Sequence, residues 1–329
     1  MNRKLFSVLS GPEKTILFLG KVDTGKTTLV TQLANEMFSK GKRVGIIDAD
    51  PGQSDIGPPG TIGLGFLKSQ VTKLSEILPE KLAFIGSTSP GGIFLWPTVW
   101  GISQLVNFAS KSADIIIIDS SGLITGRDGY VLAKSKVLTV HPDIVFFVGS
   151  AGDYIHLVNE FSLYTRVEVL PSPSGVRVKT YEERKANRIR MWKTYFRDSV
   201  EVELSWNNLE IGGFPYFGVG VPLGKEVLHS LSLELGVDVL WAEACNGKYK
   251  ILTVYPPERL VNPDWDWMHI GVLRNTFVGL EGDNGLIDVG VILDIDERKL
   301  LIKTPLCDLG RVRRVLISKL KIDEEVLKE

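Results

Sequence analysis

Short apolar runs alternate with stretches of helical periodicity over roughly the first 150 residues of the chain. This alternation is typical of a parallel β-sheet wrapped by helices. Each run is rich in β-branched or aromatic residues, and most end in Gly or Asp. Because ligands bind at the carboxyl edge of open α/β sheets, polar groups are expected to gather there. The predicted core strands are Ile16–Leu19, Val44–Ile47, Leu82–Ile85, Ile115–Ile118 and Ile144–Val148.

The pattern changes after a Pro/Ser/Gly stretch at Pro171–Gly175, which leads into a strongly basic helix from about Tyr181 to Phe196. Beyond about Ser199, short apolar segments are separated by Gly, Asn, Asp and Pro, a spacing typical of a β-rich module. We therefore expect one domain over 1–198, with a lid over about 175–198, and a smaller β-rich domain over 199–329. The predicted strands of the second domain are Val200–Leu204, Val237–Leu240, Lys250–Val254, Ile270–Leu273, Gly290–Asp294 and Leu300–Lys303.

The first apolar run leads directly into Gly-Lys-Val-Asp-Thr-Gly-Lys-Thr at Gly20–Thr27, and a helical sequence follows. Two glycines allow a tight turn whose N–H groups converge on phosphate oxygens, and the helix dipole favours the same anion. Lys26 is expected to reach the β- and γ-phosphates, and Thr27 to place its hydroxyl on Mg²⁺. An ordinary glycine turn is the alternative, but the full motif and both flanks favour a P-loop NTPase with a mostly parallel sheet. The predicted contacts to ATP or another triphosphate are Gly20, Lys21, Val22, Asp23, Thr24, Gly25, Lys26, Thr27 and Thr28.

Acidic side chains follow two of the predicted strands. In Asp48-Ala-Asp-Pro-Gly-Gln53, Asp50 is favoured as the general base and as a metal ligand, with Gln53 orienting a ligand or a metal-bound water. Asp119, at the end of an apolar strand, is expected beside Thr27, where it binds Mg²⁺ directly or through water. An acidic turn without chemistry and a capping Asp are the respective alternatives.

A loop at Gly86–Gly92, Gly-Ser-Thr-Ser-Pro-Gly-Gly, also follows a core strand. Its hydroxyls and N–H groups, those of Ser87 and Thr88 among them, could hold a second anion such as the backbone of an acceptor. By itself this pattern is more typical of a plain Ser/Pro/Gly loop.

The basic helix has one apolar stripe, formed by Ile189, Trp192 and Phe196. Arg184 and Arg188 flank the stripe on one side, and Arg190, Lys193 and Arg197 on the other. A solvated amphipathic helix is one interpretation. The other is a lid that brings positive charge to a triphosphate, because arginine suits bidentate phosphate contact and the lead-in contains glycine and proline.

The composition excludes some classes of function but does not identify one. Apolar residues make up 44% of the 329 residues and charged residues 23%, as in ordinary globular proteins. A net charge of −1 argues against a broadly basic nucleic-acid binder, and two cysteines are too few for a disulfide framework. No signal peptide or membrane span is predicted, so a cytoplasmic protein is expected.

Two families contain comparable motifs. Lys21 occupies the place of the signature lysine of dimeric switch ATPases of the partitioning and ion-pump type. A longer series of motifs resembles the polynucleotide 5′-hydroxyl kinases that act in RNA cleavage, tRNA splicing and rRNA processing, and most closely their archaeal branch. These motifs, in order, are Gly20–Thr27, Asp48–Gln53, Pro59–Gly63, Gly86–Gly92, Asp119–Tyr130, the basic helix, Val278-Gly-Leu, Ile295-Asp and Thr304-Pro.

The resemblance implies transfer of a γ-phosphoryl group to the 5′-hydroxyl of RNA, with single-stranded DNA as an open alternative. It assigns Lys26 and Thr27 to the triphosphate and Mg²⁺, Asp50 to activation of the 5′-hydroxyl, and Gln53 to the metal. It places Thr88 in an RNA clasp, and Arg188 and Lys193 in the lid. It further implies acceptor contacts for Ser87, Ser120, Gly122 and Arg184, and partners among RNA-processing proteins.

Three positions depart from the pattern of many relatives. Ile93 replaces Asn, Leu123 replaces Trp, and Lys193 replaces Arg, so an altered substrate preference is expected because an aromatic platform for bases is lost. Two other functions stay open at this point: a switch ATPase that hydrolyses ATP without an acceptor, and a nucleotide-binding scaffold without transfer activity. The nucleotide preference, the natural transcript and the oligomeric state are left open.

Overall fold

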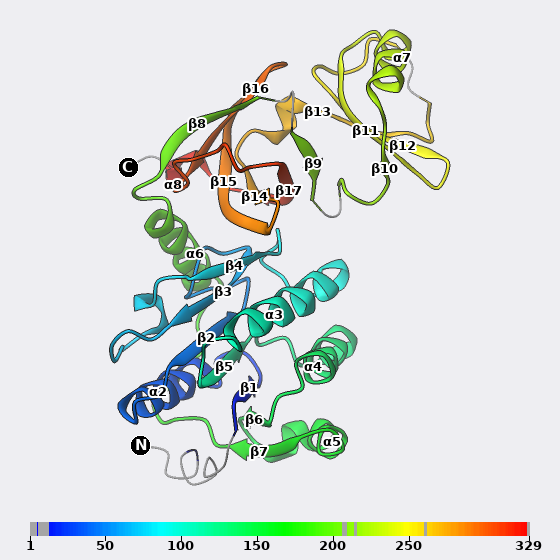
Figure 1. Cartoon of the computed structure of the whole chain (residues 1–329). Coiled ribbons are helices and arrows are strands. Elements are labelled where there is room, and N and C mark those ends of the chain that lie inside the picture. Colours follow the sequence, from blue (N-terminus) through cyan, green and yellow to red (C-terminus); the bar gives the residue numbers. More distant parts are fainter. Residues whose placement is uncertain (1–4, 6–12, 206–208, 214–215, 260–261, 328–329) are drawn as a thin grey trace. The chain divides into compact units, whose positions relative to one another are not determined.

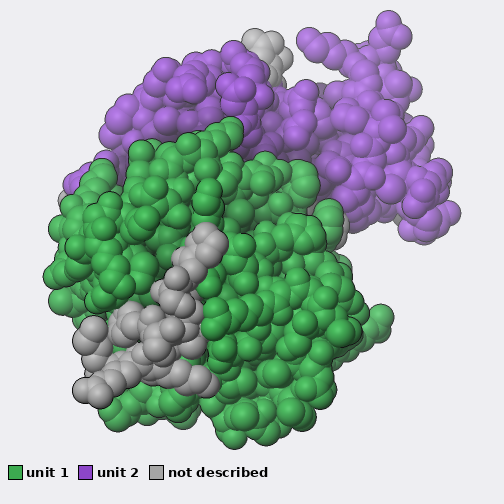
Figure 2. Space-filling model, turned by 60° about the horizontal axis from the view of Figure 1, so that its bottom comes forward, with its two compact units in different colours: residues 1–192 green, residues 193–329 purple. Residues whose placement is uncertain are grey.

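A computed structural model describes residue 5 and residues 13–205, 209–213, 216–259 and 262–327. The chain divides into two compact units, residues 1–192 and 193–329 (Figure 2). The division falls inside the basic helix, whereas the sequence places it after that helix, at 198. Each unit is treated separately below.

Unit 1 contains a seven-stranded sheet in the order β4-β3-β2-β5-β1-β6-β7 (Figure 1). All neighbours pair in parallel except β3, which is antiparallel to both β2 and β4. The strands are β1 (Thr15–Leu19), β2 (Val44–Ala49), β3 (Thr61–Phe66), β4 (Lys81–Phe84), β5 (Ile115–Ser120), β6 (Ile144–Val148) and β7 (Arg166–Leu170). The helices are α2 (Lys26–Ser39), α3 (Leu95–Ala109), α4 (Gly126–Val140), α5 (Ala151–Phe161) and α6 (Tyr181–Tyr195), with short 3₁₀ helices η1 (Leu74–Glu76) and η2 (Gly92–Phe94).

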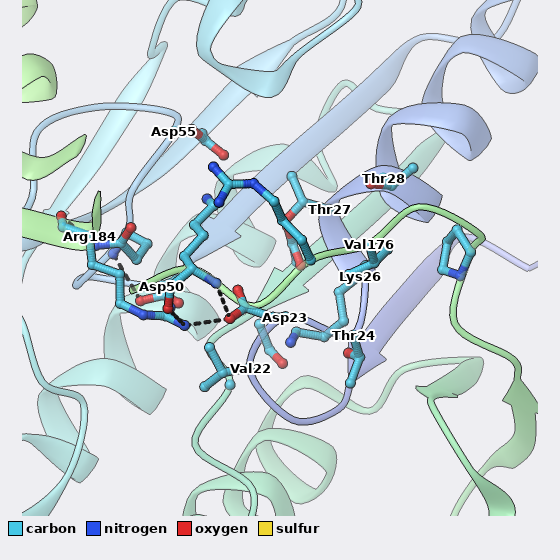
Figure 3. A pocket seen from close by; sticks show the side chains of 18 of the residues that line it. Val22, Asp23, Thr24, Lys26, Thr27, Thr28, Asp50, Asp55, Val176 and Arg184 are labelled. Carbon is cyan, nitrogen blue, oxygen red and sulfur yellow. Dashed lines mark hydrogen bonds and ion pairs between the residues drawn. The ribbon is translucent and has the colours of Figure 1, made fainter. Parts of the chain in front are cut away.

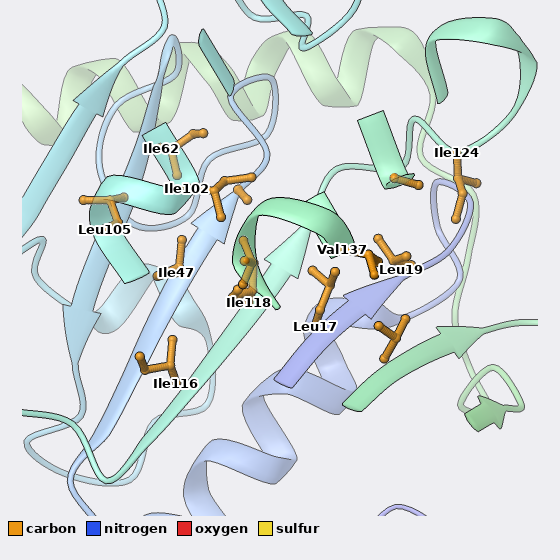
Figure 4. Packing of buried hydrophobic residues seen from close by; sticks show 14 of the residues in the cluster. Leu17, Leu19, Ile47, Ile62, Ile102, Leu105, Ile116, Ile118, Ile124 and Val137 are labelled. Carbon is orange, nitrogen blue, oxygen red and sulfur yellow. The ribbon is translucent and has the colours of Figure 1, made fainter. Parts of the chain in front are cut away.

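Successive residues of the central strands face opposite layers, as the two-residue period of a strand requires. In β1, Leu17 packs with α3, α4 and α5, whereas its neighbours Ile16 and Phe18 pack with α2. Figure 4 shows the first of these layers, with Ile102 and Val137 from the helices lying over strand residues. Helices on both faces leave the carboxyl edge of the sheet open for the loops that carry the predicted site.

The mostly parallel, helix-flanked sheet and its five predicted strands are confirmed. Two further strands, β3 and β7, were not predicted. The basic helix is also present as α6, and its buried residues Met191 and Trp192 attach it to unit 1. The indole N–H of Trp192 donates a hydrogen bond of 3.1 Å to the carbonyl oxygen of Pro59, which follows the Asp48–Gln53 segment.

Unit 2 is β-rich. Its described residues form a six-stranded sheet, β8-β16-β15-β14-β17-β9, and a four-stranded sheet, β10-β11-β12-β13. The strands are β8 (Val200–Ser205), β9 (Glu210–Gly212), β10 (Val221–Pro222), β11 (Val239–Cys245), β12 (Lys248–Thr253), β13 (Asp266–His269), β14 (Thr276–Gly282), β15 (Gly285–Ile295), β16 (Lys299–Thr304) and β17 (Arg314–Lys321). The helices are α7 (Lys225–Leu235), η4 (Ile270–Leu273) and α8 (Glu324–Leu327).

Five of the six segments predicted as strands in this unit overlap strands, and the sixth is wrong. Ile270–Leu273 forms η4, a 3₁₀ helix that begins where β13 ends at His269. Its two buried residues, Ile270 and Leu273, are three positions apart, which is the period of a 3₁₀ turn rather than of a strand.

Candidate active site

The phosphate loop lies between β1 and α2 in a conformation that needs its glycines. Gly25, directly before α2, has a φ of 85°, in the left-handed region that favours glycine. The Lys26 ammonium donates hydrogen bonds to the carbonyl oxygens of Gly20 at 3.0 Å and Lys21 at 2.8 Å. Burial lowers the pKa of Lys26, which the neighbouring carboxylates of Asp119 and Asp50 partly oppose. The lysine is thus held inside the loop by two of the loop's own carbonyl oxygens.

Thr27 and Asp119 meet as the sequence predicted. The hydroxyl of Thr27 donates a hydrogen bond of 2.5 Å to Oδ2 of Asp119. The other carboxylate oxygen, Oδ1, is buried and has no hydrogen-bond partner among the residues that the structure describes. Burial raises the pKa of Asp119 to about 6, against the opposing effects of Lys26 and Thr27. A buried carboxylate oxygen without a donor suits a cation or its bound water.

The Asp48–Gln53 segment is fixed by its own backbone. Asp48 is buried at the end of β2 and accepts hydrogen bonds from the backbone N–H groups of Asp50, Asp55 and Ile56. Its pKa is raised well above the ordinary value, mainly by burial and then by the nearby Asp55 carboxylate. Oδ1 of Asp50 accepts from the N–H groups of Gly52 at 2.9 Å and Gln53 at 3.1 Å. Asp48 therefore shapes the turn on which Asp50 is presented.

The lid segment lies directly against the phosphate loop. A Cβ placed on Gly25 would come within 2.7 Å of Pro173 Cδ and 2.8 Å of Val176 Cγ2. The Asp23 carboxylate accepts hydrogen bonds from the Lys179 backbone N–H at 2.9 Å and from the Arg184 guanidinium at 2.5 Å, as Figure 3 shows for Arg184. Gln53 joins the same helix, since its amide donates to the Arg184 carbonyl oxygen at 3.1 Å.

These elements enclose a cavity of about 350 Å³. It is lined by residues of four predicted motifs: Val22, Asp23, Thr24, Gly25, Lys26, Thr27, Thr28, Asp50, Gln53, Asp119, Ser120, Gly122 and Arg184. The sequence did not single out the lining residues Asp55, Arg177 and Lys179. Asp55 follows the predicted acidic motif closely, but nothing in the sequence marks Arg177 or Lys179 beyond their place in a basic lid.

Six predicted site residues do not line this cavity: Gly20, Lys21, Ser87, Thr88, Arg188 and Lys193. Lys21 forms an ion pair of 2.8 Å with Asp153 of α5, which raises the pKa of the lysine through a hydrogen bond. Arg188 lies on α6 one turn beyond Arg184, and Lys193 falls in unit 2.

The Gly86–Gly92 loop is adjacent to the Asp50 turn. A Cβ on Gly52 would lie 2.4 Å from the carbonyl oxygen of Thr88, so the two loops are in backbone contact. Ser87 is used within its own loop, where its hydroxyl donates to the Ser89 carbonyl oxygen and accepts from the Ser89 N–H, both at 3.0 Å. Leu123 packs near Gly91, where a Cβ would meet its Cδ2 at 3.4 Å.

Lys136 of α4 was not predicted. Its side chain is only 1% exposed, and burial lowers its pKa to about 7. The charges that act on it are those of Asp50, Lys26 and Asp119, all members of the site. In the sequence, nothing distinguishes Lys136 from Lys134 of the same helix, so its burial was not predicted.

The donor set fits Mg²⁺ of the kind that phosphate loops hold. No cluster of three His, Cys, Asp or Glu side chains able to hold a metal occurs in the described part of the chain. Mg²⁺ at nucleotide sites is usually held by one or two protein ligands together with phosphates and waters. Thr27 and the unpartnered oxygen of Asp119 would provide two such protein ligands.

Comparison with known sequences identifies close relatives. The sequence model described as "mRNA cleavage and polyadenylation factor CLP1 P-loop" matches residues 20–198. The polyribonucleotide 5′-hydroxyl-kinase of Methanocaldococcus jannaschii is 32% identical over 94% of this chain and 87% of its own. The protein of the same name from Thermococcus kodakarensis is 33% identical over 94% of this chain and 89% of its own.

A solved structure has the same fold over nearly the whole chain. The structure described as the wild-type Clp1p–Pcf11p complex superposes with a TM-score of 0.68 over 97% of this chain and 79% of that chain, at 12% identity. No helix in the described ranges is both long and apolar enough to cross a bilayer.

Proposed function

The chain belongs to the CLP1 P-loop family, and we propose that it is a polyribonucleotide 5′-hydroxyl kinase. The observation that carries the proposal is the cavity between the phosphate loop, Asp50 and the lid segment, because Lys26, Thr27 and Asp50 line it together. Support comes from relatives of that name, which match at 31–33% identity over 94–96% of this chain.

The reaction is transfer of the γ-phosphoryl group of ATP to the 5′-hydroxyl of RNA. The 5′-oxygen attacks the γ-phosphorus, the bond from that phosphorus to the β,γ-bridging oxygen breaks, and ADP leaves. The Asp50 carboxylate takes the proton of the hydroxyl. Its backbone hydrogen bonds from Gly52 and Gln53 occupy Oδ1 and hold the carboxylate in place.

The phosphate loop and the lid neutralise charge on the transferring group. Lys26 exchanges its bonds to Gly20 and Lys21 for phosphate oxygens. Further positive charge comes from side chains of α6, those of Arg184, Arg188 and Lys193. Thr27 and Asp119 would hold Mg²⁺, with Asp50 beside them. The ion would supply positive charge that offsets the negative charge of the phosphates.

The acceptor end lies against the Gly86–Gly92 loop. Thr88, Ser87, Gln53, Ser120 and Gly122 form the proposed contacts, and the packing of Gly52 on Thr88 supports a shared surface for base and acceptor. RNA-processing proteins are the proposed partners, in keeping with the cleavage and polyadenylation family.

The switch ATPase has less support. A signature lysine of that class reaches a nucleotide in a dimer, whereas Lys21 is paired with Asp153 of its own chain at 2.8 Å.

Incubation with γ-labelled ATP, Mg²⁺ and a 5′-hydroxyl oligoribonucleotide tests the function. Label on the wild-type RNA product that disappears in both Lys26→Ala and Asp50→Asn supports the kinase. The Asn side chain keeps an oxygen that can accept the hydrogen bonds of the turn. Loss of transfer in Asp50→Asn would therefore reflect loss of the base and not of the turn. Rapid phosphate release with unlabelled RNA favours the switch. Bound nucleotide without either product favours a scaffold.

A further inference from the structure

Helix α3 carries two exposed tryptophans at its N-terminal end. Trp96 is 66% exposed and Trp100 53%, the highest values among the described tryptophans. Their ring centroids are 6.3 Å apart with planes inclined by 26°, an offset-stacked arrangement. Ile93, 50% exposed, precedes them. Large apolar side chains grouped on a surface, unlike single ones, indicate a contact site.

The tryptophan pair follows the proposed acceptor site along the chain. The Asp50 turn touches Thr88 through Gly52, and the Gly86–Gly92 loop then runs through η2 into α3. The Gly92 N–H donates to Asp128 at 2.6 Å, which fixes this loop on the start of α4. Since α3 follows the carboxyl end of β4, Trp96 lies at the same edge of the sheet as the site. Trp100 is one turn further along the helix.

The chemistry of this surface suits nucleobases. Helix α3 has no charged residue between Leu95 and Ala109, so no carboxylate on it repels a phosphate backbone. Exposed Arg127 lies beside Asp128 at the start of α4 and offers a positive charge nearby. Indole faces stack on any base, which suits an enzyme that recognises an end rather than a sequence.

We propose that Trp96 and Trp100 form a stacking platform for the RNA bases beyond the second nucleotide of the acceptor. The proposal rests on the proposed function, because the platform is useful only if a strand end reaches Asp50. A protein partner is less favoured, since three side chains are far from the roughly 1,000 Å² that a stable protein interface needs.

Acceptor length tests the platform. The double variant Trp96→Ala/Trp100→Ala is compared with wild type on a 5′-hydroxyl dinucleotide and on a decamer of the same 5′ sequence. The KM for the decamer is expected to rise about 10- to 100-fold, with kcat and the dinucleotide KM unchanged. Trp96→Phe/Trp100→Phe should restore most of the decamer affinity, because phenyl rings also stack.

Tyr164→Ala is the matched control. Tyr164 is 53% exposed, as Trp100 is, but it precedes β7 and so lies at the opposite edge of the sheet. This variant should leave both acceptors unaffected. An unchanged decamer KM in the tryptophan variant overturns the platform and leaves a protein contact as the use of this surface. Equal losses on both acceptors also overturn it, because they indicate a general disturbance.

A second readout does not depend on activity. Fluorescence anisotropy of a 3′-labelled decamer measures binding directly, with the dissociation constant expected to rise about 10- to 100-fold in the alanine variant. If wild type transfers no phosphate to either acceptor, the kinase proposal fails, but the anisotropy measurement still tests the platform. Equal binding of the decamer by wild type and the alanine variant overturns the platform.

Discussion

Arg184 of the lid helix donates a hydrogen bond of 2.5 Å to Asp23 of the phosphate loop. The pair is largely shielded, with side-chain exposures of 24% and 10%. Asp23 also accepts from the Lys179 backbone N–H, so one carboxylate holds two points of the lid. The proposed lid is therefore attached directly to the phosphate loop.

Asp23→Ala is expected to loosen the lid. Loss of charged hydrogen bonds of about 1–3 kcal/mol should raise the KM for ATP about 5- to 100-fold and speed nucleotide release. Steady-state kinetics and proteolysis within residues 171–180 measure both effects. Asp153→Ala, which frees Lys21 instead, serves as the control and should leave the lid protected. A lower KM for ATP in Asp23→Ala would mean that Asp23 competes with phosphate for Arg184.

Asp119→Asn should weaken metal use while keeping the hydrogen bond from Thr27, because the amide oxygen can still accept it. We expect the Mg²⁺ concentration for half-maximal activity to rise about 10- to 100-fold. Asp114→Asn is the control, since Asp114 precedes the same strand at its other end and accepts a hydrogen bond from the Arg43 N–H at 2.7 Å. An unaltered Mg²⁺ requirement in Asp119→Asn would remove Asp119 from the metal site.

Gly52→Ala should separate the Asp50 turn from the acceptor loop. The added Cβ would lie 2.4 Å from the Thr88 carbonyl oxygen, so one of the loops must move. We expect kcat/KM for RNA to fall tenfold or more, because misplacement by about 1 Å can cost about 100-fold, while the KM for ATP stays unchanged. Gly152→Ala, at an open position in α5, is the control. Unchanged RNA kinetics would show that this loop contact has no part in acceptor binding.

Lys136→Met should stabilise the protein at neutral pH. The pKa of Lys136 is about 7 in the folded protein and 10.5 ordinarily, so burial of the charged form opposes folding fully below pH 7. This penalty, on the order of a few kcal/mol, disappears as the pH approaches 10.5. The gain in unfolding free energy should thus be large at pH 6.5 and small at pH 10, as measured by urea denaturation.

Lys134→Met gives the matched comparison within α4. The Lys134 ammonium forms an ion pair of 2.7 Å with Glu160, and its pKa is raised rather than lowered. No stabilisation is expected from this change. A gain for Lys136→Met that does not decline with pH would show that packing, not charge, explains it.

Two strands of unit 1, β3 and β7, were not predicted, and each differs from the predicted core strands in composition. β3 contains Gly63 and Gly65, and a Cβ on Gly63 would lie 1.8 Å from the Ile56 carbonyl oxygen. Its glycines serve close backbone approach. Ile62, Leu64 and Phe66 still alternate along β3, but glycine favours turns and is depleted in strands, so a turn-rich loop is the usual prediction. β7 is an edge strand of five residues, Arg-Val-Glu-Val-Leu, and its two charged residues make it less apolar than the predicted core strands.

The parts of the site that lie within short sequence motifs could be predicted from the sequence. The phosphate loop and the pairing of Thr27 with Asp119 follow from a loop between a strand and a helix and from an acidic strand end beside it. Long-range contacts could not be predicted in this way. The ion pair of Lys21 with Asp153 depends on how α5 packs, and the burial of Lys136 depends on how α4 packs.

The fate of the γ-phosphate tests the central claim most directly. Two RNAs that differ only in a 5′-hydroxyl or a 5′-phosphate are incubated with γ-labelled ATP, and transferred and free phosphate are counted together. The account predicts one label gained per ADP formed with the 5′-hydroxyl RNA, and no labelling of the 5′-phosphate RNA. Free phosphate released at equal rates with both RNAs, without label on either, would contradict it.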